Sequence, residues 1–358
     1  MSDDDLRNCL SDLESGDARH LVALPDGSVD RWYALSGAGG DRLKAADAFA
    51  DQLAAGGRAF SLEPIDARPG GQAVNAARQI DALGEAATLI GHLEHPVLSG
   101  FPFETHSMGT PATVRVVDFG SDELQFSEPG PAEDWGLADL LAVVDWDRIV
   151  GADALCCTNW VSIRGLTAVF DRLASSPPAE PLPVVVDPGP IDAVDPMALA
   201  DLFDALSQAD SADTPLAVFL SVNPMELAAA TAAAGVPDDD GADDGEDPTA
   251  YSSRECTRDR AAALRSAIGL TGVVSHGSDA AVGATRDGIQ SREMVSIGEP
   301  QRTTGAGDRF SAGLACGLAR DWPLETALAL GNACAAYFVG TGETADPAAV
   351  RSLLERID

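Results

Sequence analysis

The stretch QRTTGAGDRFSAGLACGLA (residues 301–319) places three residues with little or no side chain directly before an aspartate. These small residues are Gly305, Ala306 and Gly307. They leave the backbone accessible and free to adopt positive φ, and the apolar residues at 310, 314 and 318 share one helical face. The pattern predicts a helix that begins near Asp308. Its first N–H groups have no partner within the helix and form an anion site with the helix dipole.

The carboxylate of Asp308 at the mouth of this loop indicates proton transfer. A negative side chain beside an anion site is unfavourable if the loop only binds phosphate. In phosphoryl transfer, however, the attacking hydroxyl loses a proton while the moving phosphoryl group needs donors around it. The backbone of residues 305–307 can supply the donors and Asp308 the base. The alternative is that Asp308 only caps its helix, as aspartate often does.

A second glycine-rich segment, ARPGGQAVNAARQIDALG (residues 67–84), has the same loop-to-helix character. Gly70 and Gly71 precede a helix whose apolar residues recur every three positions and which stops at Gly84. Asn75 lies in the first turn, where its amide can both donate to and accept from a sugar hydroxyl. The alternative is a glycine turn followed by a surface asparagine.

Acidic residues outnumber basic residues by 57 to 23 in this chain of 358 residues, and the formal net charge is −34. Nucleic acid is therefore not expected as a partner, because phosphate neutralisation needs a basic face. Hydrophobic residues make up 45% of the chain, which favours a folded protein with acidity spread over its surface. With Lys44 as the only lysine, the composition resembles cytosolic proteins of extreme halophiles. We expect a loss of stability at low ionic strength, where self-repulsion is weakly screened.

The first residues, MSDDDLRNCLSDLESGD, contain neither the basic nor the apolar region of a secretory signal. No apolar stretch approaches the ~18 residues that span a bilayer. We therefore expect a soluble, cytoplasmic protein with no membrane partner. The six cysteines are too few for a disulfide framework and form no Cys-x-x-Cys pair, so we expect small buried residues.

Strand-like and helix-like segments alternate along the chain, which predicts an α/β fold with a mostly parallel sheet covered by helices on both faces. Buried strands are expected at 20–24, 181–187, 215–222 and 271–276. Helices are expected near 41–55, 72–83, 163–174, 195–207, 224–234, 255–268, 308–319 and 323–339.

Two segments interrupt the alternation. Residues 109–130 combine β-branched residues with a Gly-Ser-Asp turn, which predicts a β-hairpin and a candidate flap. Residues 236–253 are acidic and glycine-rich and are typical of a solvated surface loop. We take residues 1–18 as an acidic N-terminal extension, residues 19–358 as one domain, and residues 104–130 approximately as the segment that contains its candidate flap.

The two glycine-rich segments together resemble the N-terminal and C-terminal signatures of the ribokinase-like (PfkB-type) carbohydrate kinases, in the expected order and separation. Three further segments are similar to family landmarks. LPDGSVDR (24–31) resembles the end of the first strand with its substrate-binding acid, NPMEL (223–227) the Asn-x-x-Glu element, and SHGSDAAVG (275–283) the nucleotide-side strand and turn. The resemblance extends from about residue 20 to residue 345.

The resemblance implies a three-layer α/β/α kinase with a β lid that excludes water, using ATP and Mg²⁺ to phosphorylate a hydroxyl of a sugar or nucleoside. It implies that Asp308 is the base and that residues 305–307 are the anion hole. The implied substrate-binding residues are Asp30, Gly70, Gly71 and Asn75. The implied nucleotide-binding residues are Asn223, Glu226, Ser275, Gly277 and Thr304. Glu226 would act on Mg²⁺ through water, because Mg²⁺ gives up its waters reluctantly.

The chain departs from the family pattern at two places. Arg302 stands where the family usually has an aspartate that often belongs to a monovalent-cation site. A guanidinium there should exclude K⁺ and could supply the positive charge itself, so we predict no specific K⁺ activation. Ala280 replaces the second glycine of the nucleotide turn, which bears on the choice of phosphoryl donor.

Other residues have competing interpretations. The spacing of His92, His95 and His106 fits no helix-based ligand set, so no metal site is expected there. Trp160 either stacks on a sugar or base or belongs to the core. The side chains of Arg115 and Arg164 either receive an anionic group of the substrate or form surface salt bridges.

Two alternatives to a sugar or nucleoside kinase stay open. One is a vitamin-precursor kinase of the same fold, which the Gly-Gly-x-x-x-Asn signature disfavours. The other is a catalytically silent sugar- or nucleotide-binding relative that serves as a sensor, which the intact Asp308 and Glu226 disfavour. Dimerisation through the lid is suggested by analogy alone.

Overall fold

A nine-stranded sheet forms the middle of the computed structural model, which describes residues 3–356 except 38, 121, 212, 238–253, 296, 297 and 299. In sheet order the strands are β13 (Gly288–Glu293), β12 (Ala280–Thr285), β11 (Gly272–His276), β10 (Leu216–Val222), β9 (Leu182–Asp187), β8 (Ala154–Thr158), β1 (His20–Leu24), β4 (Ala86–Gly91) and β5 (Glu104–Ser107). The strands from β11 to β5 are parallel, and β12 and β13 are antiparallel. The predicted α/β fold with a mostly parallel sheet is confirmed.

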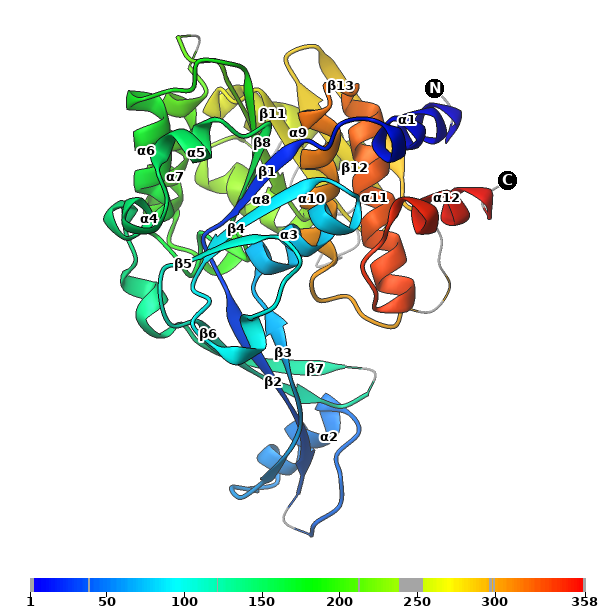
Figure 1. Ribbon diagram of the computed structural model, residues 1–358. Helices are drawn as coiled ribbons and strands as arrows, with labels where there is room; N and C mark the ends of the chain where they lie inside the picture. Colours follow the sequence, from blue (N-terminus) through cyan, green and yellow to red (C-terminus); the bar gives the residue numbers. More distant parts are fainter. Residues whose placement is uncertain are drawn as a thin grey trace.

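Helices cover both faces of this sheet (Figure 1). One face carries α1 (Asp3–Ser15), α3 (Gln72–Ala82), α10 (Ala306–Ala319), α11 (Leu324–Thr341) and α12 (Pro347–Glu355). The other carries α4 (Leu137–Val143), α5 (Trp146–Val150), α6 (Leu166–Ser175), α7 (Pro196–Ala209), α8 (Pro224–Ala233) and α9 (Arg254–Ile268). Short 3₁₀ helices lie at Pro96–Leu98, Gly130–Asp134 and Ile191–Ala193.

Strand alternation explains why the molecule has two apolar cores. Along β1, Leu21 and Ala23 pack into the core beneath α3 and α10, whereas Val22 and Leu24 pack into the core beneath α6 and α7. Successive side chains of a strand point to opposite faces, so a strand that is apolar at every position needs cover on both sides. All four predicted strands form in this way.

Within the predicted N-terminal extension, the structure describes a helix, α1. The α1 side chains of Leu6, Leu10 and Leu13 are 1%, 0% and 5% exposed and join the core beneath α11 and α12. In Figure 1, α1 lies beside α12, so the two ends of the described chain are neighbours. The acidic residues of α1 had suggested an extension, but its leucines share one helical face and anchor it.

A second sheet of four strands forms the lid. Its order is β3 (Ser61–Gly70), β2 (Ser28–Ser36), β6 (Ala112–Asp118) and β7 (Glu123–Glu128), and α2 (Ala46–Ala54) lies at its far end in Figure 1. The predicted hairpin is the antiparallel β6–β7 pair. The prediction missed β2 and β3. Strand β3 gave no signal because it is exposed at nearly every position and shows no polar–apolar alternation. It also assigned residues 104–107 to the lid, whereas these residues form β5 and pair with β4 in the large sheet.

The carboxyl ends of the parallel strands place polar residues along one edge of the large sheet. Asp26 follows β1, Asp187 ends β9, Asn223 follows β10 and His276 ends β11. Ligands of open α/β sheets bind at this edge. The predicted acidic loop at 236–253 lies, from residue 238 onward, outside the described residues. In the part of the chain that the structure describes, no helix has the length and apolar character that crossing a membrane requires.

Candidate active site

The loop before α10 has the conformation that its small residues permit. Gly305 is the N-cap residue with φ of 92°, and α10 begins at Ala306, two residues earlier than predicted. Such a φ is unfavourable for residues with a Cβ. A Cβ at Gly307 would lie 3.1 Å from the Cε1 atom of His276, so this part of the loop also has little space for a side chain. The helix N-terminus is thereby brought close to the end of β11.

Asp308 lies in the first turn of α10 and is 6% exposed. Its Oδ2 atom accepts a hydrogen bond from Asn75 Nδ2 at 2.7 Å, and its Oδ1 atom accepts one from Gln72 Nε2 at 3.1 Å. Both donors belong to α3, which the second glycine-rich segment begins. The carboxylate is therefore held by side chains from a different helix rather than by the amides of its own, which disfavours the capping interpretation.

Asp26, which the sequence analysis did not single out, fixes the start of α3. Its carboxylate accepts hydrogen bonds from the backbone N–H groups of Gln72 at 2.9 Å and Ala73 at 2.6 Å, and from Asn159 Nδ2 at 2.9 Å. Burial is the main cause that raises the pKa of Asp26. Gly71, with φ of 102°, brings the backbone against this carboxylate: a Cβ there would lie 3.1 Å from Asp26 Oδ2.

Asp30 occupies the lid side of the site, on β2. Its Oδ1 atom accepts a hydrogen bond from Ser28 Oγ at 2.7 Å, and burial is the main cause that raises its pKa. Gly70 faces this side chain so closely that a Cβ would lie 2.0 Å from Asp30 Oδ1. The first glycine of the pair is therefore required by contact with the acid, and the second by its backbone conformation.

Two further buried carboxylates face Asp308. Asp187, 5% exposed, accepts hydrogen bonds from Ser311 Oγ at 2.9 Å and Gln72 Nε2 at 3.3 Å. Burial and then the charge of Asp308 raise the pKa of Asp187 to about 7. Burial and then the charge of Asp187 raise the pKa of Glu226 to about 8. Asp187 is the last residue of a predicted buried strand, a position that could have marked it as a site residue, but the sequence analysis did not select it.

The Asn-x-x-Glu element forms a capping box at the start of α8. Asn223 Oδ1 accepts hydrogen bonds from the backbone N–H groups of Met225 and Glu226, both at 2.9 Å, and Glu226 Oε2 accepts one from the Asn223 N–H at 2.8 Å. This is the arrangement expected for Asn and Glu at these two positions. It fixes both side chains at the edge of the cavity.

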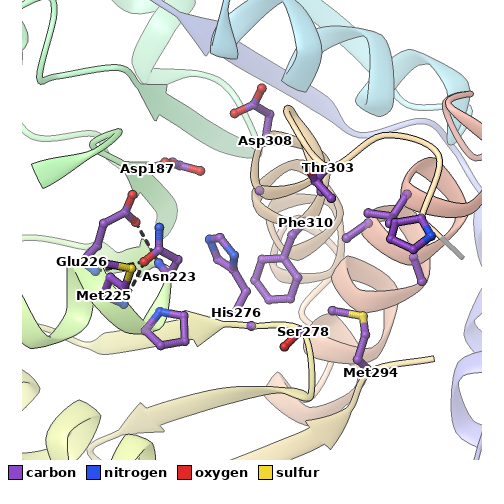
Figure 2. Close-up of a pocket in the computed structure, with 18 of the residues that line it drawn as sticks. Asp187, Asn223, Met225, Glu226, His276, Ser278, Met294, Thr303, Asp308 and Phe310 are labelled. Carbon is purple, nitrogen blue, oxygen red and sulfur yellow. Dashed lines mark hydrogen bonds between the residues drawn. The ribbon is translucent and has the colours of Figure 1, made fainter. Parts of the chain in front are cut away.

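A cavity of about 820 Å³ is lined by Gln72, Asp187 and Asp308 among other residues. The predicted substrate-binding residues Asp30, Gly70, Gly71 and Asn75 do not line it. Of the predicted residues, the cavity is lined by Asn223, Glu226, Gly277, Ala306, Gly307 and Asp308. Figure 2 shows Asp187, Asn223 and Glu226 along one side, His276 and Phe310 in the middle and Met294 beyond them. The Nε2 atom of His276 is buried without a hydrogen-bond partner, and burial lowers the pKa of this imidazole to about 4.

Two predicted nucleotide-binding residues lie elsewhere than expected. Ser275 does not line the cavity, and its buried hydroxyl has no hydrogen-bond partner. Thr304 also lies outside the cavity lining: its hydroxyl donates to Glu123 and accepts from Gln125 Nε2 at 3.5 Å, and both partners belong to lid strand β7. The loop geometry before α10 turns Thr304 outward, towards the lid.

The positively charged residues that were considered for an anionic substrate group lie away from the cavity. Arg115 forms an ion pair with Glu128, and the Arg164 guanidinium stacks on Trp160, 3.8 Å from the ring centroid. Trp160 itself is 2% exposed and belongs to the core. Arg302 lies 5.2 Å from the ring centroid of lid residue Trp32.

The three histidines considered for a metal have separate protein partners. His92 contacts the carbonyl oxygen of Pro25 at 3.4 Å, His95 accepts from the Val97 N–H at 3.2 Å, and His106 contacts Glu104 at 2.9 Å. Within the described ranges, no group of three or more His, Cys, Asp and Glu side chains is arranged to hold a metal ion.

A large, mostly parallel sheet covered by helices on both faces, with a separate small sheet beside it, is the architecture of the ribokinase fold. Among similar solved structures is an Arabidopsis thaliana ribokinase complexed with ribose and ATP, with a TM-score of 0.65, 16% identity and coverage of 95% of this chain and 99% of that chain. Another is a Thermotoga maritima ribokinase, with a TM-score of 0.63, 16% identity and coverage of 94% and 99%. These likenesses establish the fold.

The family is established by the sequence. The family model described as prokaryotic ketohexokinase matches residues 38–357, so the chain belongs to that family of carbohydrate kinases. The ketohexokinase of Haloferax volcanii is 27% identical over 325 residues, which cover 84% of this chain and 80% of the relative. The resemblance to PfkB-type kinases is confirmed, the protein is a sugar kinase, and the Haloferax relative supports the halophilic interpretation of the composition.

Proposed function

We propose that this protein transfers the γ-phosphoryl group of ATP to a hydroxyl of a ketohexose, with Asp308 as general base and the backbone of residues 305–307 as anion hole. The observation that carries the proposal is the buried carboxylate of Asp308, held at 2.7 Å by Asn75 beside the N-terminus of α10. The choice of a ketohexose comes from the family and from the name of the Haloferax relative.

Asp308 has the capacity to accept the proton of the attacking hydroxyl. Each of its oxygens accepts one side-chain hydrogen bond, and a carboxylate oxygen has a second lone pair for the substrate. A base must lie about 2.6–3.2 Å from the proton-donating oxygen. The two amides from α3 restrict the carboxylate to one orientation, which is the condition for placing it at this distance. The same helix N-terminus offers N–H donors to the phosphoryl group as its charge moves.

The sugar would lie between α3 and the lid. The predicted residues Asp30, Gly70, Gly71 and Asn75 would surround it, and we add Gln72 to them. The Oε1 atom of Gln72 is buried without a hydrogen-bond partner, and Gln72 lines the cavity. A buried acceptor without a donor favours a ligand that brings one, such as a sugar hydroxyl.

The nucleotide would occupy the cavity between α8, β11 and α11. Asn223, Gly277 and the unpartnered Nε2 of His276 are polar groups for its phosphates. Apolar side chains on the far side suit an adenine ring. These are Met294, Val295, Pro300, Ala335 and Val339.

The residues present also fit Mg²⁺. Glu226 and Asp187 are buried acids at the cavity, and burial together with neighbouring negative charge raises the pKa of both. A cation favours their ionised forms. They would hold Mg²⁺ through its water molecules, with the phosphates as the remaining ligands. When bound, the ion neutralises charge on the phosphates of ATP.

The test is Mg²⁺-dependent ADP release from ATP in molar KCl, with ketohexoses, aldohexoses, pentoses, nucleosides and vitamin precursors as acceptors. We expect turnover with ketohexoses. Asp308→Asn should lower kcat by about 10²–10⁴-fold, the contribution of general-base catalysis. Asp171→Asn, an exposed acid on α6, is the matched control and should retain activity. A folded wild-type protein that binds ketohexose without turnover would favour the sensor alternative, and turnover with a vitamin precursor alone would favour the other.

We also propose a homodimer through the lid. The lid exposes large apolar side chains: Leu62, Ile65 and Phe126 are 47%, 49% and 54% exposed. Two of them lie on β3, the edge strand of the lid sheet, and unpaired edges with apolar residues favour pairing with a second chain. Light scattering in molar KCl should give twice the chain mass for the wild type and the chain mass for Ile65→Asp. A monomeric wild type would contradict this proposal.

A further inference from the structure

Arg309 follows the proposed base directly and is the most deeply buried guanidinium beside the candidate site. Its side chain is 3% exposed. Nη1 donates to the carbonyl oxygen of Gly305 at 2.7 Å, and Nη2 donates to Asn75 Oδ1 at 3.3 Å. The guanidinium carbon lies 3.7 Å from the ring centroid of Phe338 on α11. One side chain therefore contacts both the proposed anion hole and the residue that holds the base.

The contact with Gly305 fixes the peptide that leads from the proposed anion-hole loop into α10, whose N–H, on Ala306, donates to the Thr303 carbonyl oxygen at 3.1 Å. In a planar peptide the C=O and the following N–H point in opposite directions. Holding the Gly305 carbonyl against Arg309 therefore fixes the orientation of the peptide plane that leads into α10. The approach is close: a Cβ at Gly305 would lie 2.8 Å from Arg309 Nη1. The absence of a side chain at residue 305 thus serves this contact as well as the positive φ.

The contact with Asn75 fixes the orientation of its amide. A guanidinium can only donate, and an ionised carboxylate can only accept. Asn75 lies between the two, so its oxygen must face Arg309 and its NH₂ group must face Asp308. A flipped amide would place two donors together on one side and two acceptors together on the other. Arg309 therefore determines, through Asn75, which way the hydrogen bond to Asp308 runs.

The burial of this charge is not explained by an ion pair. Among the described residues, no carboxylate lies within 4.0 Å of the Arg309 guanidinium. Burial lowers the pKa of Arg309 to about 10, so the group keeps its charge at neutral pH. The charge of Asp308 acts on Arg309 from beyond ion-pair distance. Burying a charge without a direct partner is unfavourable, and an apolar side chain against Phe338 would be less costly. The cation is consistent with a site that receives polyanionic ATP beside the Asp308 carboxyl group.

We propose that Arg309 is a positioning residue that acts on catalysis through two oxygen atoms, the Gly305 carbonyl and Asn75 Oδ1. The proposal rests on the proposed roles of Asp308 and residues 305–307. Arg309 holds the anion-hole peptide and the amide of Asn75 in the orientations that phosphoryl transfer needs. Its removal should therefore lower kcat more than it raises either KM.

The test compares Arg309→Ala and Arg309→Lys with the wild type and with Asp308→Asn in 3 M KCl. Arg309→Lys keeps a charge but cannot form the two-armed contact of a guanidinium. Arg78→Met is the matched control, because Arg78 is exposed on α3 yet close enough to influence Arg309 electrostatically. Rates are measured with and without ~50 mM methylguanidinium chloride, or methylammonium chloride at the same concentration, as probes of the space left in Arg309→Ala.

We expect both Arg309 variants to lose about 10- to 10³-fold in kcat, the range seen when a preorganised donor is removed, while Arg78→Met keeps its rate. Methylguanidinium should raise the kcat of Arg309→Ala at least about tenfold, and methylammonium should leave this kcat unchanged. If near-UV circular dichroism shows that Arg309→Ala does not fold, the proposal is tested by Arg309→Lys alone: a loss of kcat supports it, and an unchanged kcat overturns it. A purely structural role would give no selective rescue.

Failure of this inference can be distinguished from failure of the proposed function. Inactive Asp308→Asn with Arg309 variants near the wild-type rate would overturn this inference alone. Loss of kcat in Arg309→Ala with no rescue, or with equal rescue by methylammonium, would also overturn it. Active Asp308→Asn would overturn the proposed function and this inference with it.

Discussion

Glu226→Gln should make the protein more stable at neutral and alkaline pH. Burial and then the charge of Asp187 raise the pKa of Glu226 from 4.5 to about 8. Between these two values the folded state binds a proton that the unfolded state has lost. Ionising the buried carboxyl therefore opposes folding, and the wild-type free energy of unfolding falls as pH rises from 4.5 to about 8. The amide that the substitution introduces cannot ionise, and its oxygen can still accept the capping hydrogen bond from Asn223.

The magnitude follows from the shift, 8 − 4.5 = 3.5 pH units. At 1.36 kcal/mol per unit, the full effect is about 5 kcal/mol above pH 8 and roughly 2 kcal/mol at pH 6. We expect a difference of several kcal/mol at pH 9 and almost none at pH 4. Because the charges of Asp187 and Glu226 act on each other, the difference between the two proteins reports the ionisation of Glu226 together with its effect on Asp187.

The assay is urea unfolding in 3 M KCl at pH 4 to 9, followed by tryptophan fluorescence, for the wild type and Glu226→Gln. The two free energies should be close at low pH and diverge above pH 5, with the variant more stable. Mg²⁺ with ADP should narrow the gap, because a cation favours the ionised carboxylate of the wild type. Parallel pH curves for the two proteins would refute the reasoning, since they would mean that Glu226 is not buried as a proton-binding acid.

Three other outcomes can be checked. Gly70→Ala places a Cβ 2.0 Å from Asp30 Oδ1. This variant should raise the KM for the sugar at least about tenfold, with little change in the KM for ATP. Equal changes in both KM values would contradict the proposed position of Asp30 at the sugar. Leu10→Ala, at a fully buried position of α1, should lower the free energy of unfolding by about 2–5 kcal/mol in urea titrations, whereas an unimportant extension would give no change. With Arg302 in place of the aspartate, KCl and NaCl at matched ionic strength should support equal turnover, and a selective K⁺ effect would oppose this.

The large sheet and its main helices could be predicted because their signals are local. The strands are short apolar runs, and α10 and α3 each follow glycines that permit the entering turn. The lid strand β3 gave no such signal, since nearly all of its residues are exposed and its sequence lacks a period of two. Burial patterns predict strands only where one face has a core to cover.

The candidate site could be predicted in part, for the same reason. Asp308 lies within a motif that can be read locally. Asp187 and Asp26 come to the site through partners far away in the chain: Gln72 Nε2 reaches Asp187 across 115 residues, and the Gln72 N–H reaches Asp26 across 46. A single acid after a strand gives no indication of such a partner. The role proposed for Arg309 was hidden likewise, because its contact with Asn75 spans 234 residues.

The loop before α10 is where the parts of the molecule meet. Thr304 is hydrogen-bonded to Glu123 of the lid, and the next residue, Gly305, is held by Arg309, which also contacts Asn75 of α3. A lid that moves away must break the Thr304 contact, and a sugar that displaces Asn75 must disturb the Arg309 contact. The orientation of one short loop therefore depends on the lid and on α3 together. A lid that stays open until the sugar binds would leave Thr304 without its lid partner and the proposed anion hole less ordered, which would favour transfer to a sugar over transfer to water.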